Sequence, residues 1–454
     1  MISLGKRVRS LGAAAVLLAA TMPARAGDVP TGRLIETVAC AADATQTYAL
    51  YVPTSFDPTR TWPVIFCFDP GARGRVPVER FMAAAEKFGY IVAGSNNSRN
   101  GPWAANANAI NLMIHDVDRV LPLDRKRIYA AGLSGGARTA CQVAVAGVAH
   151  GVIACSGGFM NRETPAEVRF PFFGAAGLQD FNYLELREVD RDLAARHAPH
   201  RVLIHAGGHE WLPPEFAMEA LAWLDLQAMR SGAKPKDAEW IAAQFAARLA
   251  AVPAQPAAEN FRALESLVAD FGGLVDVSEC EKKITALGAA REVREALKAE
   301  RAAERREQSV TDDLLGAVRD GFTNEVRKTS AELRVKATLP EGSPERQMAT
   351  RVLQGVYISC AEPARELLRN ENYDGAAPLL EMMTLLQPDR PQAFFDLARC
   401  RAHRGDRKKA LAALQQAAAA GFKDVARIEA ESAFAPLRSE PAFLDLLRAM
   451  RGRP

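Results

Sequence analysis

Short apolar runs alternate with helical segments between about residues 45 and 229. The runs are rich in Val, Ile and Phe and show little alternation, which is typical of parallel strands buried on both faces. They lie at 48–52, 64–68, 90–93, 128–131, 152–155, 172–175 and 202–205. Apolar residues three and four positions apart predict helices between them, at 78–88, 107–120, 137–148, 183–196 and 215–229. The pattern predicts an α/β fold with a mostly parallel sheet flanked by helices.

The pattern changes after residue 232, where strand-like runs end and Ala, Glu, Arg and Leu dominate. We place a domain boundary there, between a domain at 27–232 and a helical connecting region at 233–340, with a second helical domain at 341–454. Residues 291–308 carry charge on nearly every helical face, so we predict a solvated connecting helix rather than a docking surface. This segment favours two separate modules.

The last part of the chain contains a repeat. The segments 373–377 and 407–411 are offset by 34 positions, and Leu380 aligns with Leu414 along the same offset. This is the tetratricopeptide period, and residues 393–406 resemble the consensus of that repeat. Two such units cannot bury their faces alone, so we expect them to pack on the preceding helices and on a closing segment near 435–450. The default role of such an array is packing or binding a protein partner.

The N-terminal residues 1–26 have the pattern of a secretory signal peptide. Three basic residues precede an apolar run at 11–22, and Ala24-Arg25-Ala26 follows it. The run is too short to span a bilayer comfortably, which disfavours the alternative of a permanent anchor. Removal of 1–26 takes away four cations and no acid, so the formal charge falls from +3 to −1. We therefore predict an exported protein, periplasmic or secreted, with no stable membrane span after signal removal and no nucleic-acid partner.

Seven cysteines are scattered along the chain without a C-x-x-C pair or a metal-ligand spacing. No zinc site is indicated. An odd number of cysteines leaves at least one thiol free or intermolecular if disulfides form. We expect no metal and no cofactor.

The strongest local motif is Gly132-Leu133-Ser134-Gly135-Gly136. It follows an apolar strand and precedes a helix, which is the order that a G-x-S-x-G nucleophile turn requires. The glycines at 132 and 136 allow the backbone to approach closely on both sides of the serine. Ser134 is therefore the candidate nucleophile.

A serine nucleophile needs a histidine base and a carboxylate that orients it. Among the seven histidines, only His209 lies in a glycine-bearing loop just beyond a late predicted strand. Asp180 ends the preceding strand-and-turn segment 171–180 and is the candidate acid. Glu210 is too close to His209 in sequence to point back at it. The chain order Ser134, Asp180, His209 is that of α/β-hydrolases.

The oxyanion of an acyl-transfer intermediate needs two N–H donors. Gly135 follows the nucleophile and is the first candidate, and Gly71, in the loop after the strand 64–68, is the second. Ala72 is the alternative to Gly71, because Pro70 has no N–H. Candidate substrate-facing residues share loop positions beside this predicted site, and they are Asn97, Trp103 and Trp211, with Asn96 and Arg99 as further loop residues.

Together, residues 45–229 resemble the α/β-hydrolase family, and among its members the exported esterases grouped with polyhydroxybutyrate depolymerase, feruloyl esterase and dienelactone hydrolase. The resemblance rests on the serine motif, Asp180 and Gly208-His209-Glu210-Trp211. It departs from that group at Asp69-Pro70-Gly71, where such esterases commonly have His-Gly. The resemblance implies a serine hydrolase that cleaves small-molecule or polymeric carboxylic esters. Two alternatives stay open, a prolyl-oligopeptidase-like peptidase and an inactive hydrolase-fold platform that binds a protein partner through its repeats.

Overall fold

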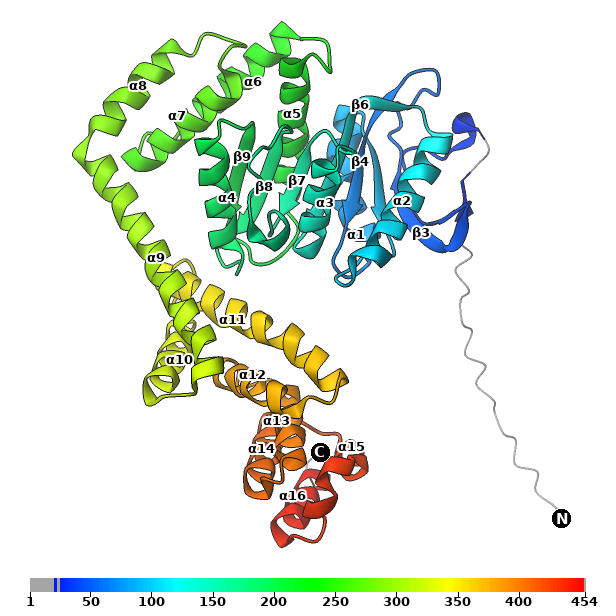
Figure 1. Ribbon diagram of the computed structural model, residues 1–454. Helices are drawn as coiled ribbons and strands as arrows, with labels where there is room; N and C mark the ends of the chain where they lie inside the picture. The colour runs from blue at the N-terminus through cyan, green and yellow to red at the C-terminus, as the bar shows by residue number, and fades with distance from the viewer. Residues whose placement is uncertain (1–19, 23–24, 453–454) are drawn as a thin grey trace, which may run out of the picture. The chain divides into compact units, whose positions relative to one another are not determined.

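The computed structural model describes residues 20–22 and 25–452 (Figure 1). Most of the predicted signal peptide, 1–26, lies outside the described residues. Of that segment, Ala20–Thr21 forms strand β1, which pairs in parallel with β2 (Ile35–Cys40).

The sheet has nine strands in the order β1-β2-β3-β5-β4-β6-β7-β8-β9. Strand β4 is parallel to both β5 and β6, and β6 is parallel to β7, whereas β3 is antiparallel to β2 and to β5. The sheet is therefore mixed and mostly parallel, as predicted. The remaining strands are β3 (Asp43–Tyr51), β4 (Trp62–Phe68), β5 (Ile91–Ser95), β6 (Leu123–Leu133), β7 (Val152–Cys155), β8 (Phe172–Gly177) and β9 (His200–His205).

Helices flank the sheet in alternation with the strands (Figure 1). All seven residues of β4 are buried, which explains its unbroken apolar sequence. The sequence did not predict β2. The helices of this part are α1 (Arg75–Phe88), α2 (Trp103–Val120), α3 (Gly135–Val145), α4 (Tyr183–Ala195) and α5 (Pro214–Ser231), within a few residues of the predicted segments. These elements give the α/β fold, with a mostly parallel sheet flanked by helices, that the sequence predicts.

After α5 every described element is helical, as predicted. The helices are α6 (Ala238–Ala250), α7 (Ala257–Phe271), α8 (Ser278–Ala289), α9 (Arg291–Asp320), α10 (Asn324–Lys336), α11 (Pro344–Arg369), α12 (Tyr373–Leu386), α13 (Pro391–His403), α14 (Arg407–Ala419), α15 (Val425–Ala430) and α16 (Pro441–Arg451).

The repeat period is visible in the helix starts. Helices α12 and α14 begin 34 residues apart. Each is capped by the side chain before it, since Asn372 accepts a hydrogen bond from Gly375 N–H and Asp406 accepts one from Lys409 N–H. The two apolar cores of this part meet at α13, one formed with α9 to α12 and the other with α14 to α16. The predicted closing segment is therefore present and packed.

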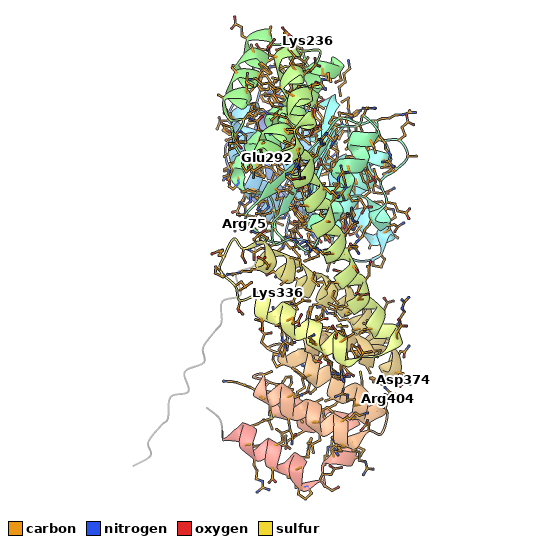
Figure 2. The ribbon with its side chains drawn as sticks, turned by 90° about the vertical axis from the view of Figure 1, so that its left-hand side faces the viewer. Arg75, Lys236, Glu292, Lys336, Asp374 and Arg404 are labelled. Atoms are coloured by element: carbon orange, nitrogen blue, oxygen red, sulfur yellow. The ribbon has the colours of Figure 1, made fainter. Side chains whose placement is uncertain are left out.

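One surface ion pair links two neighbouring repeat helices. Arg404, which directly follows α13, binds Asp374 at the start of α12, with 3.0 Å between Nε and Oδ1 (Figure 2). Both side chains are exposed, so this pair contributes little to stability.

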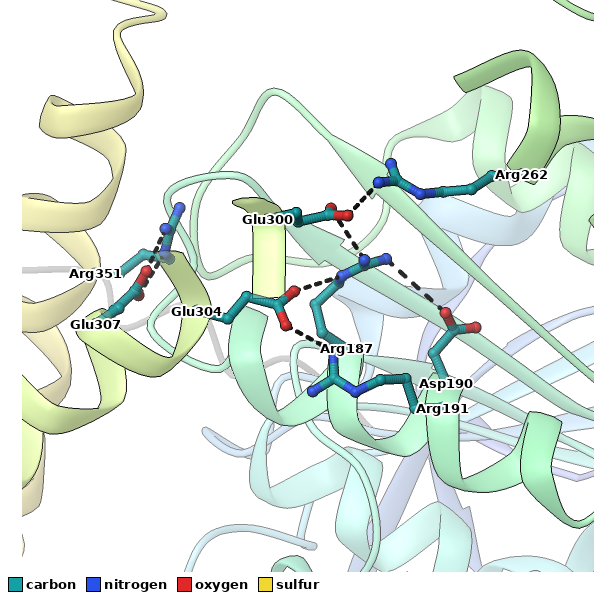
Figure 3. A network of polar contacts seen from close by, with 8 residues as sticks. All are labelled: Arg187, Asp190, Arg191, Arg262, Glu300, Glu304, Glu307 and Arg351. Carbon is teal, nitrogen blue, oxygen red and sulfur yellow. Dashed lines mark hydrogen bonds and ion pairs between the residues drawn. The ribbon is translucent and has the colours of Figure 1, made fainter. Parts of the chain in front are cut away.

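Helix α9 corrects one prediction, because one of its faces is docked. Glu300, Glu304 and Glu307 form a stripe that meets arginines of α4, α7 and α11 (Figure 3). Arg187 of α4 binds both Glu300 and Glu304, at 3.1 and 3.2 Å. The charge pattern of 291–308 therefore combines a solvated surface with a docking face, and it does not mark a separation of modules.

The contacts divide the chain into two compact units that do not follow the predicted borders. One comprises residues up to Phe173, Ala198–His200 and Trp211–Lys236, and the other Gly174–His197, Arg201–Glu210 and Asp237–Pro454. The end of β8, α4 and most of β9 thus group with the helical region. The ion pairs between α4 and α9 account for part of this grouping.

All seven cysteines are free and buried. Burial raises the pKa of the Cys360 and Cys400 thiols to about 12, and that of Cys40 to about 11. Within the described part of the chain, no helix is both long and apolar enough to cross a membrane.

Candidate active site

The backbone turns sharply at Ser134, between β6 and α3. Its φ of 55° and ψ of −118° lie in a region that residues with a side chain rarely adopt. Such strain costs about 1–3 kcal/mol and persists where the surroundings impose it. Here the Ser134 N–H donates a hydrogen bond to the Cys155 carbonyl at the end of β7, at 2.8 Å. The geometry is that of the predicted nucleophile turn.

Both flanking glycines are required by close backbone contacts. A Cβ on Gly132 would lie 2.0 Å from the Gly136 carbonyl oxygen, and a Cβ on Gly136 would lie 1.9 Å from that of Phe68. Neither distance is possible for a side chain, and the nearest atoms are backbone atoms that cannot swing away. The G-x-S-x-G pattern is thus explained by packing of β6, α3 and β4.

Asp180 and His209 form a hydrogen-bonded pair. Asp180 Oδ1 lies 2.8 Å from His209 Nδ1, and it also accepts the Asn182 N–H at 2.9 Å. The Asp180 side chain is fully buried, whereas His209 retains 21% of its side-chain exposure. A proton on Nδ1 bound to the carboxylate leaves Nε2 as the basic nitrogen. The pair has the geometry of an oriented general base.

The ring of Phe181 supports this histidine. Phe181 stacks on His209 with 4.0 Å between ring centroids and 23° between ring planes.

Glu210, by contrast, accepts the Gly208 N–H at 3.3 Å. The structure therefore brings Asp180 and His209 together, in the unit that contains the helical region, while Ser134 belongs to the other unit.

The predicted oxyanion donors differ in whether their N–H groups already donate a hydrogen bond within the protein. Gly135 is the first residue of α3, where an N–H has no acceptor within the helix. The Gly71 N–H, however, donates to Asp69 Oδ1 at 2.8 Å, and the Ala72 N–H donates to the Asp69 carbonyl at 3.1 Å. The loop donors are engaged within their own turn.

Asp69 organises this loop. Its buried carboxylate binds Arg73 through Oδ1 and Oδ2, at 2.8 and 3.0 Å, and accepts the Trp211 indole N–H at 2.9 Å. Trp211 is only 4% exposed and packs edge-on against Phe81. This burial does not fit the expected substrate-facing role, because the indole is part of the packing between the loop and α1.

Of the other two predicted substrate residues, Asn97 is also engaged in packing, whereas Trp103 is exposed. Asn97 accepts the Thr47 N–H at 2.7 Å and donates to the Thr45 carbonyl at 3.1 Å, so its amide holds the loop to β3. A side chain used at both ends is poorly suited to bind a substrate. Trp103, at the start of α2, is 43% exposed and remains a candidate contact.

Sequence reasoning missed Asn100. A Cβ on Gly135 would lie 1.9 Å from Asn100 Oδ1, so this amide rests directly against the residue after the nucleophile. The Asn100 N–H donates to the Pro70 carbonyl at 3.0 Å, which joins the loop after β5 to the loop after β4. The signal was available, since Asn100 lies in the same polar loop as the residues that were chosen.

Comparison with known proteins covers the two parts of the chain separately. A model of the tetratricopeptide repeat matches residues 367–430. No curated protein matches the chain. The C-terminal helix pairs are thus similar to tetratricopeptide repeats.

The similar solved structures include S-formylglutathione hydrolase (FrmB) from Staphylococcus aureus, at 14% identity and a TM-score of 0.33 over 39% of this chain and 90% of that one. A ferulic acid esterase is 15% identical, with a TM-score of 0.36 over 42% of this chain and 96% of that one. Esterase B from Lactobacillus rhamnosis is 16% identical, with a TM-score of 0.36 over 46% of this chain and 92% of that one. These are likenesses of fold at low identity, and the activities in these names belong to those proteins.

Proposed function

We propose that this protein is a serine hydrolase of carboxylic esters, with Ser134 as nucleophile, His209 as general base and Asp180 as the residue that orients His209. The observation that carries the proposal is the strained turn at Ser134 between two obligatory glycines. The hydrogen-bonded pair of Asp180 and His209 supplies the second part of the machinery. The two parts come in the chain order of α/β-hydrolases.

In this mechanism Ser134 Oγ attacks the ester carbonyl while His209 Nε2 accepts the hydroxyl proton. The C–O bond to the alcohol then breaks, and the departing alkoxide takes that proton from His209. Water hydrolyses the acyl-enzyme by the same steps, returning the proton to Ser134. Asp180 stabilises the imidazolium in both halves and is not itself protonated.

Gly135 supplies one N–H for the oxyanion. Gly71 can serve as the second donor only if its N–H exchanges the Asp69 carboxylate for the intermediate. Each donor of this kind contributes about 2.7–4 kcal/mol to lowering the barrier. Trp103 is the proposed substrate contact, and Asn97 and Trp211 hold the surrounding loops.

The test is hydrolysis of a graded series of p-nitrophenyl esters by the purified chain and by three variants, Ser134→Ala, Asp180→Asn and His209→Ala. We expect kcat/KM to fall by about 10³-fold or more in each. A fluorophosphonate probe should label the parent chain and not Ser134→Ala. Turnover of peptide anilides in place of esters would favour the peptidase, and absence of both turnover and labelling would favour the binding platform.

Export is part of the proposal and rests on the composition of 1–26. Expression of the full chain in a Gram-negative host should place the protein in the periplasm or medium, with a mature N-terminus near Gly27. Retention of the intact N-terminus in the cytoplasm would contradict it.

A second candidate function is binding of an acidic protein segment by the repeats. A groove of about 1080 Å³, between helices α9, α10, α12, α13 and α14, is lined by six cationic and three acidic side chains. The acids already have cationic partners, for example Glu381 with Arg327 and Arg401. The excess positive charge favours an acidic partner.

Titration with fluorescent peptides of acidic, neutral and basic composition tests this groove. We expect the acidic peptides to bind most tightly, with affinity that falls as salt rises, and Arg319→Glu to weaken them. Equal binding of all three compositions would contradict an electrostatic groove.

A further inference from the structure

We infer that helix α11, which belongs to the helical C-terminal region, positions the catalytic acid, with Arg351 and Gly355 as the positioning residues. Both contact the loop from Leu178 to Tyr183 that carries Asp180. The inference rests on the proposed function of Asp180 and His209. It assigns the C-terminal region a part in catalysis besides any partner that it binds.

Arg351 holds the loop from two sides. Its guanidinium donates a hydrogen bond to the Leu178 carbonyl, two residues before Asp180. The same group lies 4.6 Å from the ring centroid of Tyr183, three residues after Asp180. Burial raises the pKa of the Tyr183 phenol, so the ring beneath the cation stays neutral.

The guanidinium is itself fixed by α9. Glu307 binds Arg351 through both carboxylate oxygens, at 2.7 and 2.6 Å, and the two side chains are only 6% and 10% exposed (Figure 3). A bidentate pair in a buried setting has one well-defined geometry. The Leu178 carbonyl is therefore held by a group that cannot move freely.

Gly355 lies one helical turn beyond Arg351 and contacts the same loop. A Cβ at this position would lie 3.3 Å from Phe181 Cβ. Phe181 in turn stacks on His209. One turn of α11 thus touches residues on both sides of Asp180 and supports the ring that covers the histidine.

The rest of the loop is fixed to β9. The Leu178 N–H donates to the His205 carbonyl at 2.8 Å, and the Gln179 N–H donates to the Gly207 carbonyl at 3.1 Å. The Leu178 N–H is therefore held by β9, and the Leu178 carbonyl is held by Arg351. If Arg351 releases that carbonyl, this peptide keeps only the hydrogen bond from the Gln179 N–H to Gly207, and we expect Asp180 Oδ1 to shift relative to His209 Nδ1. Small displacements of a catalytic pair lower the rate strongly.

The first test compares Arg351→Lys with the parent chain. Lysine keeps a positive charge beside Glu307 but cannot hold both the carboxylate and the Leu178 carbonyl in a planar fork. We expect kcat for p-nitrophenyl esters to fall about 10- to 100-fold while KM changes little, and the acid limb of the pH profile to shift as His209 loses its oriented partner. The control is Arg399→Lys, which alters a half-buried pair with Glu431 far along the chain from this loop.

The second test uses Gly355→Ala, which helix propensity favours. The added methyl group presses on Phe181, so we expect lower kcat with unchanged or higher thermal stability. The control is Gly316→Ala in α9, whose Cβ would have no atom nearer than 3.8 Å. If the contact of α11 with Phe181 serves stability alone, Gly355→Ala and Gly316→Ala should have the same activity.

Parent-like kcat and an unshifted pH profile in folded Arg351→Lys and Gly355→Ala would overturn the inference. Turnover that survives Ser134→Ala would instead defeat the proposed function. In that case the NMR signal of the His209 Nδ1 proton still decides the positioning claim. A signal present in the parent chain and lost or shifted in Arg351→Lys supports it, and an unchanged signal overturns it.

Discussion

At the scale of single residues, Ser134 is held in a strained backbone conformation by its neighbours. The carbonyl oxygens of Gly136 and Phe68 leave no room for a Cβ at positions 132 and 136. The positive φ at Ser134 is therefore held by packing and not by a flexible loop. This is the residue-level feature that the sequence predicted best, because the spacing of the glycines encodes it directly.

The buried carboxylate of Asp69 leads to a first prediction. Trp211→Phe removes the indole N–H that binds Asp69, while Arg73 still satisfies the carboxylate. We expect the free energy of unfolding to fall by about 1–2 kcal/mol in urea titrations, with KM for esters unchanged. A raised KM at unchanged stability would restore Trp211 as a substrate contact.

The thiols lead to a second prediction. Because burial raises the pKa of Cys360 and Cys400 to about 12, only about one part in ten thousand of each is thiolate near pH 8. We expect the native chain to resist Ellman's reagent and all seven thiols to react after denaturation without reductant. Fewer than seven would reveal a disulfide in the isolated protein.

At the scale of elements, apolar periodicity identified the buried strands and the helices between them. Strand β2 was missed because only its last three residues are buried, so its apolar pattern is short. The docking face of α9 was missed for another reason. Its glutamates are surrounded by other charges in sequence, and their partners on α4 and α11 are remote along the chain.

The docking of α9 leads to a third prediction. In a double-mutant cycle of Arg187→Gln and Glu304→Gln, we expect a coupling free energy of about 1 kcal/mol or more, because these side chains are only 17% and 12% exposed. The exposed pair of Arg291 and Glu295 on the same helix is the control, and its coupling should be below about 0.5 kcal/mol. Equal coupling in both cycles would mean that α9 is not held by this network.

At the scale of the whole molecule, the sequence predicted the kinds of domain but not where the contacts divide. Asp180 and His209 could be chosen from chain order and strand ends. Arg351 could not, because it lies 173 residues from the carbonyl that it binds and inside a helix that looks like a repeat unit. No local pattern marks a contact of that length.

This division leads to a fourth prediction, for the fragment 27–236. It lacks α9 and α11, so α4 and the loop before it lose the ion pairs with Glu304 and the hydrogen bond from Arg351. We expect a lower melting temperature than that of 27–454 and slower labelling by a fluorophosphonate probe. Addition of the fragment 237–454 should recover part of the labelling. A fragment that is labelled as fast as 27–454 would show that the helical region is dispensable.

Helix α11 packs on two sides. Val352 and Val356 lie in the apolar core of the repeats, whereas Arg351 and Gly355 contact the loop that carries Asp180. A protein engineer who wishes to exchange the repeats for another binding array therefore cannot cut at the apparent start of the array. The graft must keep residues through Arg369, so that only the helices from α12 onward are replaced. The same restriction applies to natural recombination, and it predicts that the α/β domain and the helices through α11 are inherited as one block.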